Sequence, residues 1–275
     1  MELAELQQIA EHERSRQKPT RIRCCTAAGC VSSGSLAVKT AFDREIAAQG
    51  LTDRVEACNV GCLRLCCAGP LVQMDPSREL YEAVKPEQVP SIVASFGQAE
   101  SRAQLGAPAT RGDSSRPFFT KQMPIVLENS GIVEPERIES YIAAGGYQAL
   151  HHAIRETSPD QIVDTITCSG LRGRGGAGYP TGVKWGLVAK MPGDRKFVVC
   201  NADEGDPGAF MDRSVLESDP HRVLEGMAIA AYAVSATQGY IYVRGEYTLA
   251  STLRYFRSEY DRLLKNNGRV SLPLR

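Results

Sequence analysis

The chain has 275 residues, of which 43% are hydrophobic and 23% charged, as is typical of a folded globular protein. This composition excludes a disordered, collagen-like or coiled-coil chain. Lys plus Arg and Asp plus Glu number 32 each, so no net charge draws the chain to nucleic acid or to an anionic membrane. The longest apolar stretch, residues 227–234, is far shorter than the roughly 20 residues of a membrane-spanning helix. The N-terminus lacks the apolar core of a signal peptide, so we expect a cytoplasmic protein.

The first 96 residues predict a small α/β domain. Strand-like residues 20–24 lead into a predicted helix over residues 33–49, in which Val38, Phe42 and Ile46 form one apolar stripe. Three further strands are expected at residues 54–58, 71–74 and 79–84, and a helix at residues 86–96. This βαβ–β–α order favours a thioredoxin-like domain over residues 1–96.

The rest of the chain predicts a linker and a second α/β domain. Residues 97–117 are rich in Gly, Ala, Ser, Pro and Arg with almost no large apolar side chains, so we interpret them as the linker. The second domain is expected over residues 118–275. Its predicted helices lie around residues 135–157, 160–167, 219–236 and 247–265, and its strands at 196–200 and 240–244. Strands and helices in succession predict a parallel sheet.

Cysteines are unusually concentrated near the N-terminus, where seven of nine lie between residues 24 and 67. In a reducing cytosol, such a cluster indicates metal or redox chemistry before disulfides. Four residues separate Cys25 from Cys30, and three separate Cys62 from Cys66. Four thiolates on two loops suit zinc or an iron–sulfur cluster. These spacings are looser than those of a zinc ribbon and favour iron–sulfur.

The other five cysteines are interpreted as non-ligands. Cys24 and Cys67 each neighbour a candidate ligand, and spacing alone does not decide which neighbour binds. Cys58 is interpreted as structural. The isolated Cys168 and Cys200 fit the simpler hypothesis of small buried side chains.

A glycine-dense segment spans residues 170–185. Gly173, Gly175 and Gly178 satisfy the pattern G-x-G-x-x-G, but a predicted helix precedes them and no acid follows at the spacing of a Rossmann fingerprint. We therefore reject that fingerprint. Backbone without side chains still approaches a phosphate or a flat ring closely. The cations beside it are Arg172, Arg174 and Lys184. The competing interpretation is a flexible loop.

An acidic segment, NADEGDPG, directly follows the strand predicted at residues 196–200. Ligands of open α/β sheets bind at the carboxyl ends of strands. Amide and carboxylate groups there suit ribose or ribityl hydroxyls. These groups belong to Asn201, Asp203, Glu204 and Asp206. The competing interpretation is a turn rich in Asp, Gly and Pro.

The cysteine loops carry a family resemblance. RIRCCTAAGCVSSGS and GCLRLCCAGPLV resemble the thioredoxin-like [2Fe-2S] domain of the small flavoprotein-fraction subunit of complex I. They are more similar still to the version fused to hydrogenase diaphorase subunits. The resemblance implies a [2Fe-2S] cluster on Cys25, Cys30, Cys62 and Cys66. Arg64 stands where many relatives have Gly.

Residues 118–265 resemble the flavin-binding large subunit of complex I and its hydrogenase and formate dehydrogenase relatives. The resemblance implies an incomplete Rossmann-like FMN-binding α/β domain. It places FMN contacts on Gly173, Arg174, Gly175, Lys184, Asn201, Asp203 and Glu204. It places contacts with NAD on Gly176, Tyr179 and Asp206.

The function implied by this resemblance is that of an NAD(P)H:acceptor oxidoreductase, the diaphorase subunit of a bidirectional hydrogenase. Hydride would pass between NAD(P)H and FMN, and single electrons would continue to iron–sulfur clusters. The expected cofactors are FMN, NAD(P) and a [2Fe-2S] cluster, and no catalytic side chain is expected. The expected partners are other diaphorase and hydrogenase subunits, without nucleic acid or a membrane span.

Several competing hypotheses stay open. The family's second flavin-contacting segment and its [4Fe-4S] motif are absent from the sequence, so we expect a C-terminally truncated chain. One hypothesis is that such a chain is a noncatalytic remnant, which serves as a [2Fe-2S] carrier or assembly partner. Further hypotheses are a fused flavoprotein subunit of complex I or of an electron-bifurcating hydrogenase, and a zinc-binding α/β module.

Overall fold

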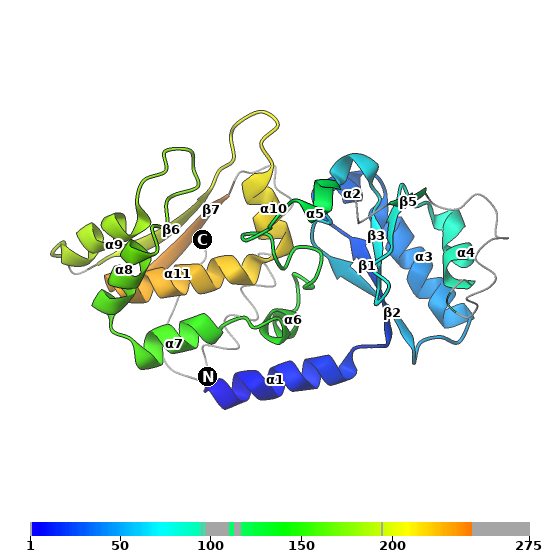
Figure 1. The fold of residues 1–275 in the computed structure, drawn as a ribbon, viewed down its shortest axis with the longest axis horizontal. Helices are drawn as coiled ribbons and strands as arrows, with labels where there is room; N and C mark the ends of the chain where they lie inside the picture. Colours follow the sequence, from blue (N-terminus) through cyan, green and yellow to red (C-terminus); the bar gives the residue numbers. More distant parts are fainter. Residues whose placement is uncertain (1, 95, 97–109, 113–116, 194, 244–275) are drawn as a thin grey trace. The chain divides into compact units, whose positions relative to one another are not determined.

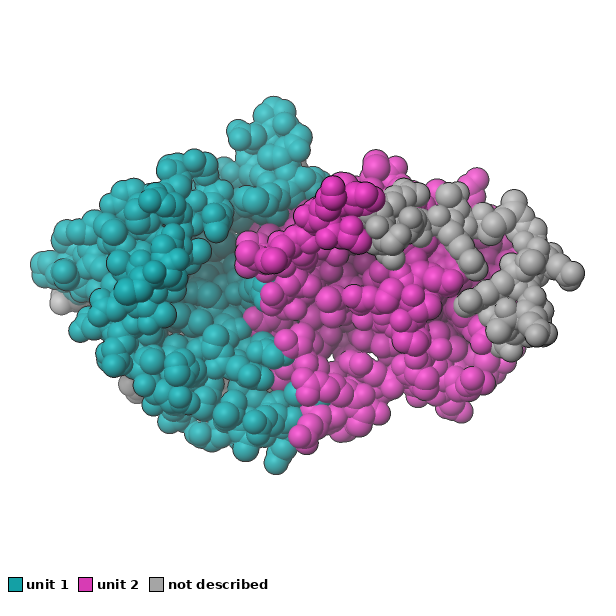
Figure 2. All heavy atoms as spheres, in the orientation of Figure 1, with its two compact units in different colours: residues 1–10, 145–213, 220–275 teal, residues 11–144, 214–219 magenta. Residues whose placement is uncertain are grey.

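The computed structural model describes residues 2–94, 96, 110–112, 117–193 and 195–243. They fall into two units, which are coloured separately in Figure 2. Unit 2 comprises residues 11–144 and 214–219. Unit 1 comprises the described parts of residues 1–10, 145–213 and 220–275. The division of the sequence into domains at residues 96 and 117 stays a prediction.

Unit 2 is built on a five-stranded mixed sheet in the order β2-β1-β3-β4-β5. β1 pairs in parallel with β2, and the other pairings are antiparallel. The strands are β1 (Thr20–Cys25), β2 (Val55–Val60), β3 (Val72–Asp75), β4 (Leu80–Glu82) and β5 (Thr110–Gly112). The predicted order of strand, helix, strand, hairpin and helix is confirmed, and β5 adds an edge strand within the predicted linker.

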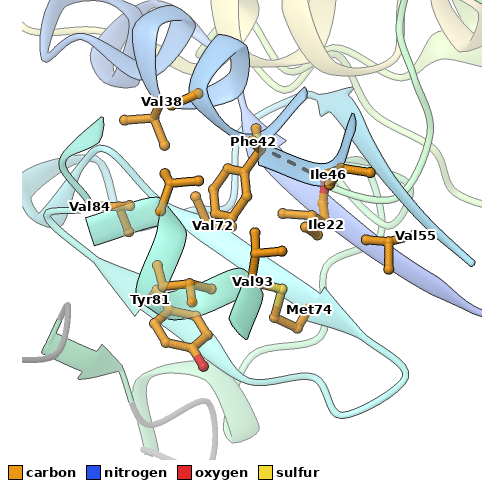
Figure 3. Close-up of a cluster of buried hydrophobic side chains, with 14 residues drawn as sticks. Ile22, Val38, Phe42, Ile46, Val55, Val72, Met74, Tyr81, Val84 and Val93 are labelled. Carbon is orange, nitrogen blue, oxygen red and sulfur yellow. Dashed lines mark hydrogen bonds between the residues drawn. The ribbon is translucent and has the colours of Figure 1, made fainter. Parts of the chain in front are cut away.

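A helical crossover explains why β1 and β2 run in parallel, because parallel neighbours need a long connection. That connection contains α2 (Ala28–Ser32) and α3 (Ser35–Ala48). The predicted stripe on α3 is confirmed, since Val38, Phe42 and Ile46 are all buried. In Figure 3 they lie together with Ile22 of β1 and Val72 of β3. Full burial of one such side chain contributes roughly 1.5–3 kcal/mol to stability.

Shorter helices complete unit 2. These are η1 (Cys66–Ala68), η2 (Pro86–Gln88), α4 (Val89–Ala94), α5 (Pro117–Thr120) and α6 (Ile138–Ala143). The loop before α6 packs against β1, where the Arg23 guanidinium donates to the Gly131 carbonyl at 3.2 Å. Arg21 of the same strand pairs with Glu134 at 3.1 Å. Residues far beyond position 96 therefore help to build the sheet unit.

Unit 1 contains the parallel pair β6 (Phe197–Ala202) and β7 (Gln238–Val243), which confirms the predicted parallel pairing. Between these strands lie α10 (Met211–Ser218), whose residues from Ser214 onward belong to unit 2, and α11 (Pro220–Val234). Figure 1 shows α11 beside the strands. The other helices are α7 (Gln148–Glu156), α8 (Pro159–Cys168) and α9 (Thr181–Lys190), and α1 (Leu3–Arg16) starts in unit 1.

Three details differ from the sequence-based expectations. The helix expected over residues 135–157 is interrupted between α6 and α7, where Gly145 and Tyr147 both have positive φ angles. The glycine-dense segment is shorter than expected, because α9 begins at Thr181. Helix α10 was not predicted. The helix expected at residues 247–265 lies outside the described residues. No helix in the described part of the chain is long and apolar enough to cross a membrane.

Candidate functional site

The four candidate ligand cysteines lie on two loops at the same end of β1 and β2. Cys25 is the last residue of β1 and pairs in register with Val60, the last residue of β2. Cys30 follows on α2, Cys62 comes just after β2, and Cys66 opens η1. Because parallel strands end at one edge of the sheet, the two loops become neighbours.

The thiols of these four residues converge. The sulfur atoms of Cys62 and Cys66 are 3.7 Å apart. The Cys25 thiol is within hydrogen-bonding reach of the thiols of both Cys30 and Cys62. Two glycines make room for the sulfurs: a Cβ on Gly69 would lie 2.9 Å from the Cys30 sulfur, and one on Gly29 would lie 3.4 Å from that of Cys66.

Alternation along β1 separates Cys25 from Cys24, which spacing alone did not do. Successive side chains of a strand point to opposite faces. Cys24 therefore packs in the core with Phe42, whereas Cys25 packs with Cys30 and Cys62. Cys58 lies elsewhere on β2, where its sulfur accepts a hydrogen bond from Arg21 at 3.2 Å.

Proximity and burial shift the acidity of the thiols. The hydrogen bond with Cys30 raises the pKa of Cys25 to about 12, with burial acting in the same direction and the hydrogen bond with Cys62 opposing it. The same bond lowers the pKa of Cys30. A hydrogen bond with Cys25 and burial raise the pKa of Cys62, and burial raises that of Cys66 to about 11. Metal binding at these thiols therefore requires proton release.

The arrangement fits a binuclear cluster. Among the described residues, no group of three or more His, Cys, Asp or Glu side chains is arranged to hold a single metal ion. A [2Fe-2S] cluster takes four cysteine ligands, shared between two irons. Two thiolates about 2.3 Å from one tetrahedral centre lie roughly 3.8 Å apart, which matches the 3.7 Å between Cys62 and Cys66.

The backbone around Cys62 is held by groups that the sequence reading missed. The N–H of Arg64 donates to the Cys62 sulfur at 3.2 Å. Arg64 has φ 68°, in the left-handed region that favours glycine. The Ser130 hydroxyl donates to the Cys62 carbonyl at 2.6 Å, and the Ser218 hydroxyl accepts from the Cys62 N–H at 2.9 Å. No local pattern signals these distant partners.

The glycine loop between α8 and α9 is an exposed, hairpin-like loop. Its arms pair through an N–H of Gly173 and the carbonyl of Tyr179 at 2.9 Å. The guanidinium of Arg172 donates to the Gly178 carbonyl at 2.9 Å. A Cβ on Gly175, Gly176 or Gly178 would meet no heavy atom within 4 Å, so the backbone is accessible to a ligand.

The other predicted residues of this loop are also accessible. Arg174 and Lys184 are exposed, and Lys184 lies near the start of α9. Tyr179 is 50% exposed, so its ring is accessible for stacking on a flat ligand. The loop therefore offers backbone, cations and an aromatic ring to one ligand.

The acidic loop follows β6. The Asn201 side chain accepts from the N–H of Asp203 at 3.0 Å, and Asp206 is exposed. The Glu204 carboxylate accepts from the N–H groups of Asp212 and Arg213 at 3.0 and 3.3 Å, and so holds the start of α10. In Figure 1 this loop and the glycine loop both extend toward the top of the view. Their assignment as FMN and NAD contacts stays a prediction.

Comparison with known proteins shows what this part of the chain is similar to. Residues 166–261, which include both loops, match the sequence profile of the Nuo51 FMN-binding domain. The predicted resemblance is thereby confirmed for the Nuo51 segment, by which we mean residues 166–261.

Curated relatives of the chain come from hydrogenases and quinone oxidoreductases. The chain is 55% identical over 130 residues to the NADP-reducing hydrogenase subunit HndC of Solidesulfovibrio fructosivorans, covering 47% of this chain and 26% of that protein. It is 50% identical over 127 residues to an NADH-quinone oxidoreductase subunit of Rhizobium meliloti, covering 46% and 30%. It is 32% identical over 231 residues to NAD-reducing hydrogenase HoxS subunit alpha of Cupriavidus necator, covering 82% and 37%. The chain thus spans well under half the length of each.

Proposed function

We propose that the chain is a diaphorase subunit, an NAD(P)H:acceptor oxidoreductase that works as part of a hydrogenase. The observation that carries this proposal is the convergence of four cysteine thiols in a chain that also contains the Nuo51 segment. The names of the relatives support the same activity, since two are NAD- or NADP-reducing hydrogenase subunits. The proposed cofactors are FMN, NAD(P) and one [2Fe-2S] cluster.

The residues of the glycine loop suit the binding of FMN. Gly173 and Gly175 let the backbone approach the cofactor, while Arg174 and Lys184 offset phosphate charge. Asn201, Asp203 and Glu204 supply polar groups from the acidic loop. FMN, when bound, supplies the capacity to take a hydride and release single electrons.

NAD(P)H is proposed to contact three other residues of the two loops. Gly176 gives access along the backbone, the Tyr179 ring stacks on the nicotinamide, and Asp206 bonds ribose hydroxyls. These residues orient the reactants, and none of them has to transfer a proton. Cys25, Cys30, Cys62 and Cys66 hold the cluster as thiolates.

We also propose a cytoplasmic location with other diaphorase and hydrogenase subunits as partners. All nine cysteines are free thiols in the structure, which agrees with a reducing compartment.

Anaerobic purification of the full chain with added FMN, iron and sulfide tests the proposal. We expect bound FMN together with iron and sulfide in equal amounts, and reduction of an artificial acceptor by NADH or NADPH. Cys25→Ser or Cys62→Ser should abolish the iron–sulfur absorption and leave FMN bound. The matched controls, Cys24→Ser and Cys67→Ser, should retain the cluster.

Two outcomes would contradict the diaphorase proposal. A chain that holds iron and sulfide but never retains FMN would be a noncatalytic [2Fe-2S] carrier. A chain that holds zinc and shows no visible absorption would be a zinc-binding module.

A further inference from the structure

A short segment from the end of α10 contacts both cysteine loops. Residues 217–219 lie in the Nuo51 segment by sequence, yet they belong to unit 2. Ser218 is fully buried, and Asp219 is 3% exposed. We refer to Glu217, Ser218 and Asp219 as the 217–219 segment.

Ser218 holds the loop of Cys62 and Cys66. Its hydroxyl accepts from the Cys62 N–H at 2.9 Å, while Ser130 donates to the Cys62 carbonyl at 2.6 Å. The backbones approach so closely that a Cβ on Gly61 would lie 2.4 Å from the Ser218 Cα. Both peptide groups of Cys62 are therefore fixed from outside its own loop.

Glu217 holds the loop of Cys25 and Cys30. Its carboxylate accepts from the Ala28 N–H, midway between those cysteines, at 2.9 Å. Asp219 anchors the segment, because its carboxylate accepts from the buried Asn129 amide at 2.8 Å. Three successive side chains thus contact the loop of Cys25 and Cys30, the loop of Cys62 and Cys66, and Asn129.

We propose that Glu217 and Ser218 are positioning residues for the [2Fe-2S] cluster. They fix the separation of the two ligand loops, and the Glu217 carboxylate lowers the cluster's reduction potential. Reduction adds one electron to the cluster, and a negative charge nearby opposes that gain. This inference rests on the proposed function, because it requires a cluster on the four cysteines.

A redox titration of the loaded full chain, followed by electron paramagnetic resonance, tests the effect on potential. Glu217→Gln should raise the ratio of reduced to oxidised cluster at a fixed potential by roughly tenfold, as for a unit charge on the order of 10 Å away. Glu217→Asp, which keeps the charge, should restore most of the wild-type value. Glu87→Gln, an exposed site on η2, removes the same charge and should change nothing.

Hydrogen exchange of the cluster-free chain tests the fixing of the loops separately. Ser218→Ala should speed exchange in peptides that contain Cys62, and Glu217→Gln should do so in peptides that contain Ala28. Glu87→Gln should leave both unchanged. If both variants match Glu87→Gln in exchange and Glu217→Gln matches it in potential, the positioning role is wrong.

The wild-type chain separates this failure from failure of the proposed function. If wild-type protein assembles no iron–sulfur cluster, the diaphorase proposal and the effect on potential are both overturned. If it assembles the cluster and the variants change neither potential nor exchange, only the positioning role is overturned.

Discussion

Cys24 and Cys25 are adjacent in the sequence but differ in role, because successive side chains of a strand point to opposite faces of the sheet. Cys24 and Cys25 are adjacent in β1, but the strand directs one into the hydrophobic core and the other toward the remaining thiols. Burial raises the pKa of Cys24 well above its usual range, so its thiol stays protonated at neutral pH. The pKa values of Cys25, Cys62 and Cys66 are raised as well, so the direction of its side chain, rather than its acidity, separates Cys24 from the candidate ligands.

Cys200 allows a residue-scale prediction about pH. Burial and, second, the carboxylate of Asp212 raise the pKa of this thiol. A raised pKa lowers the thiolate fraction at neutral pH, so alkylation should accelerate as pH rises toward the pKa. Asp212→Asn should lower the pKa of Cys200 and speed its alkylation at constant pH.

Iodoacetamide labelling from about pH 7 to about pH 9, with mass spectrometry of the Cys200 peptide, measures these rates. Asp160→Asn, an exposed carboxylate on α8, is the matched control and should leave the rate unchanged. Equal rates for Asp212→Asn and wild type at every pH would show that Asp212 does not act on Cys200.

At the scale of elements, a side chain from one helix holds the start of another. The Glu225 carboxylate on α11 accepts from the N–H groups of Tyr147 and Leu150 at the beginning of α7, both at 2.9 Å. Glu225 is 7% exposed. A buried carboxylate at this position satisfies helix donors and interacts favourably with the helix dipole.

Glu225→Ala should destabilise α7, because it leaves two amide donors without this acceptor at a cost of about 3 kcal/mol. Glu225→Gln, which keeps one acceptor and the shape, should cost about 1 kcal/mol. Hydrogen exchange of residues 147–156 and urea denaturation measure both effects. Glu156→Gln changes an exposed residue of α7 and should shift stability by less than about 0.5 kcal/mol. If Glu225→Ala behaves like Glu156→Gln, the carboxylate does not stabilise α7.

The elements that local patterns predicted are those with a strong apolar period. The stripe on α3 and the alternation in β1 lie within one element, so the sequence shows them directly. The break between α6 and α7 was missed because Tyr147 adopts φ 62°, which its own side chain does not signal. Glu225 stabilises that break from 78 residues away. Helix α10 was also missed from the sequence, because the carboxylate that accepts from its first N–H groups belongs to Glu204, which lies outside the helix.

At the scale of the whole molecule, the sheet unit is discontinuous in sequence. The Cys62 carbonyl and N–H bind residues 68 and 156 positions further along the chain. The thioredoxin-like domain predicted over residues 1–96 contains all four candidate ligands but none of these partners. The sequence therefore predicted the ligands, through their spacing, but not the groups that hold them, because contacts between distant segments leave no periodic signal.

A fragment of residues 1–96 tests how much the later segments contribute. We expect this fragment to lose its iron–sulfur absorption in air faster than the full chain does, because Ser130 and Ser218 no longer hold Cys62. The decay of visible absorption at constant temperature measures the difference. A fragment of residues 1–144, which regains Ser130, should fall between the two. Equal decay for all three chains would show that residues 1–96 are self-sufficient.

The hydrogen bond between Cys62 and Ser218 also forms late during synthesis of the chain, because it joins residues that are 156 positions apart. A ribosome makes Cys62 long before Ser218, and domains fold as their residues emerge. During that interval the loop of Cys62 and Cys66 lacks the hydrogen bond with Ser218, while Ser130 is already available to the Cys62 carbonyl. The loop therefore gains its final set of hydrogen bonds only after residues 217–219 have been made.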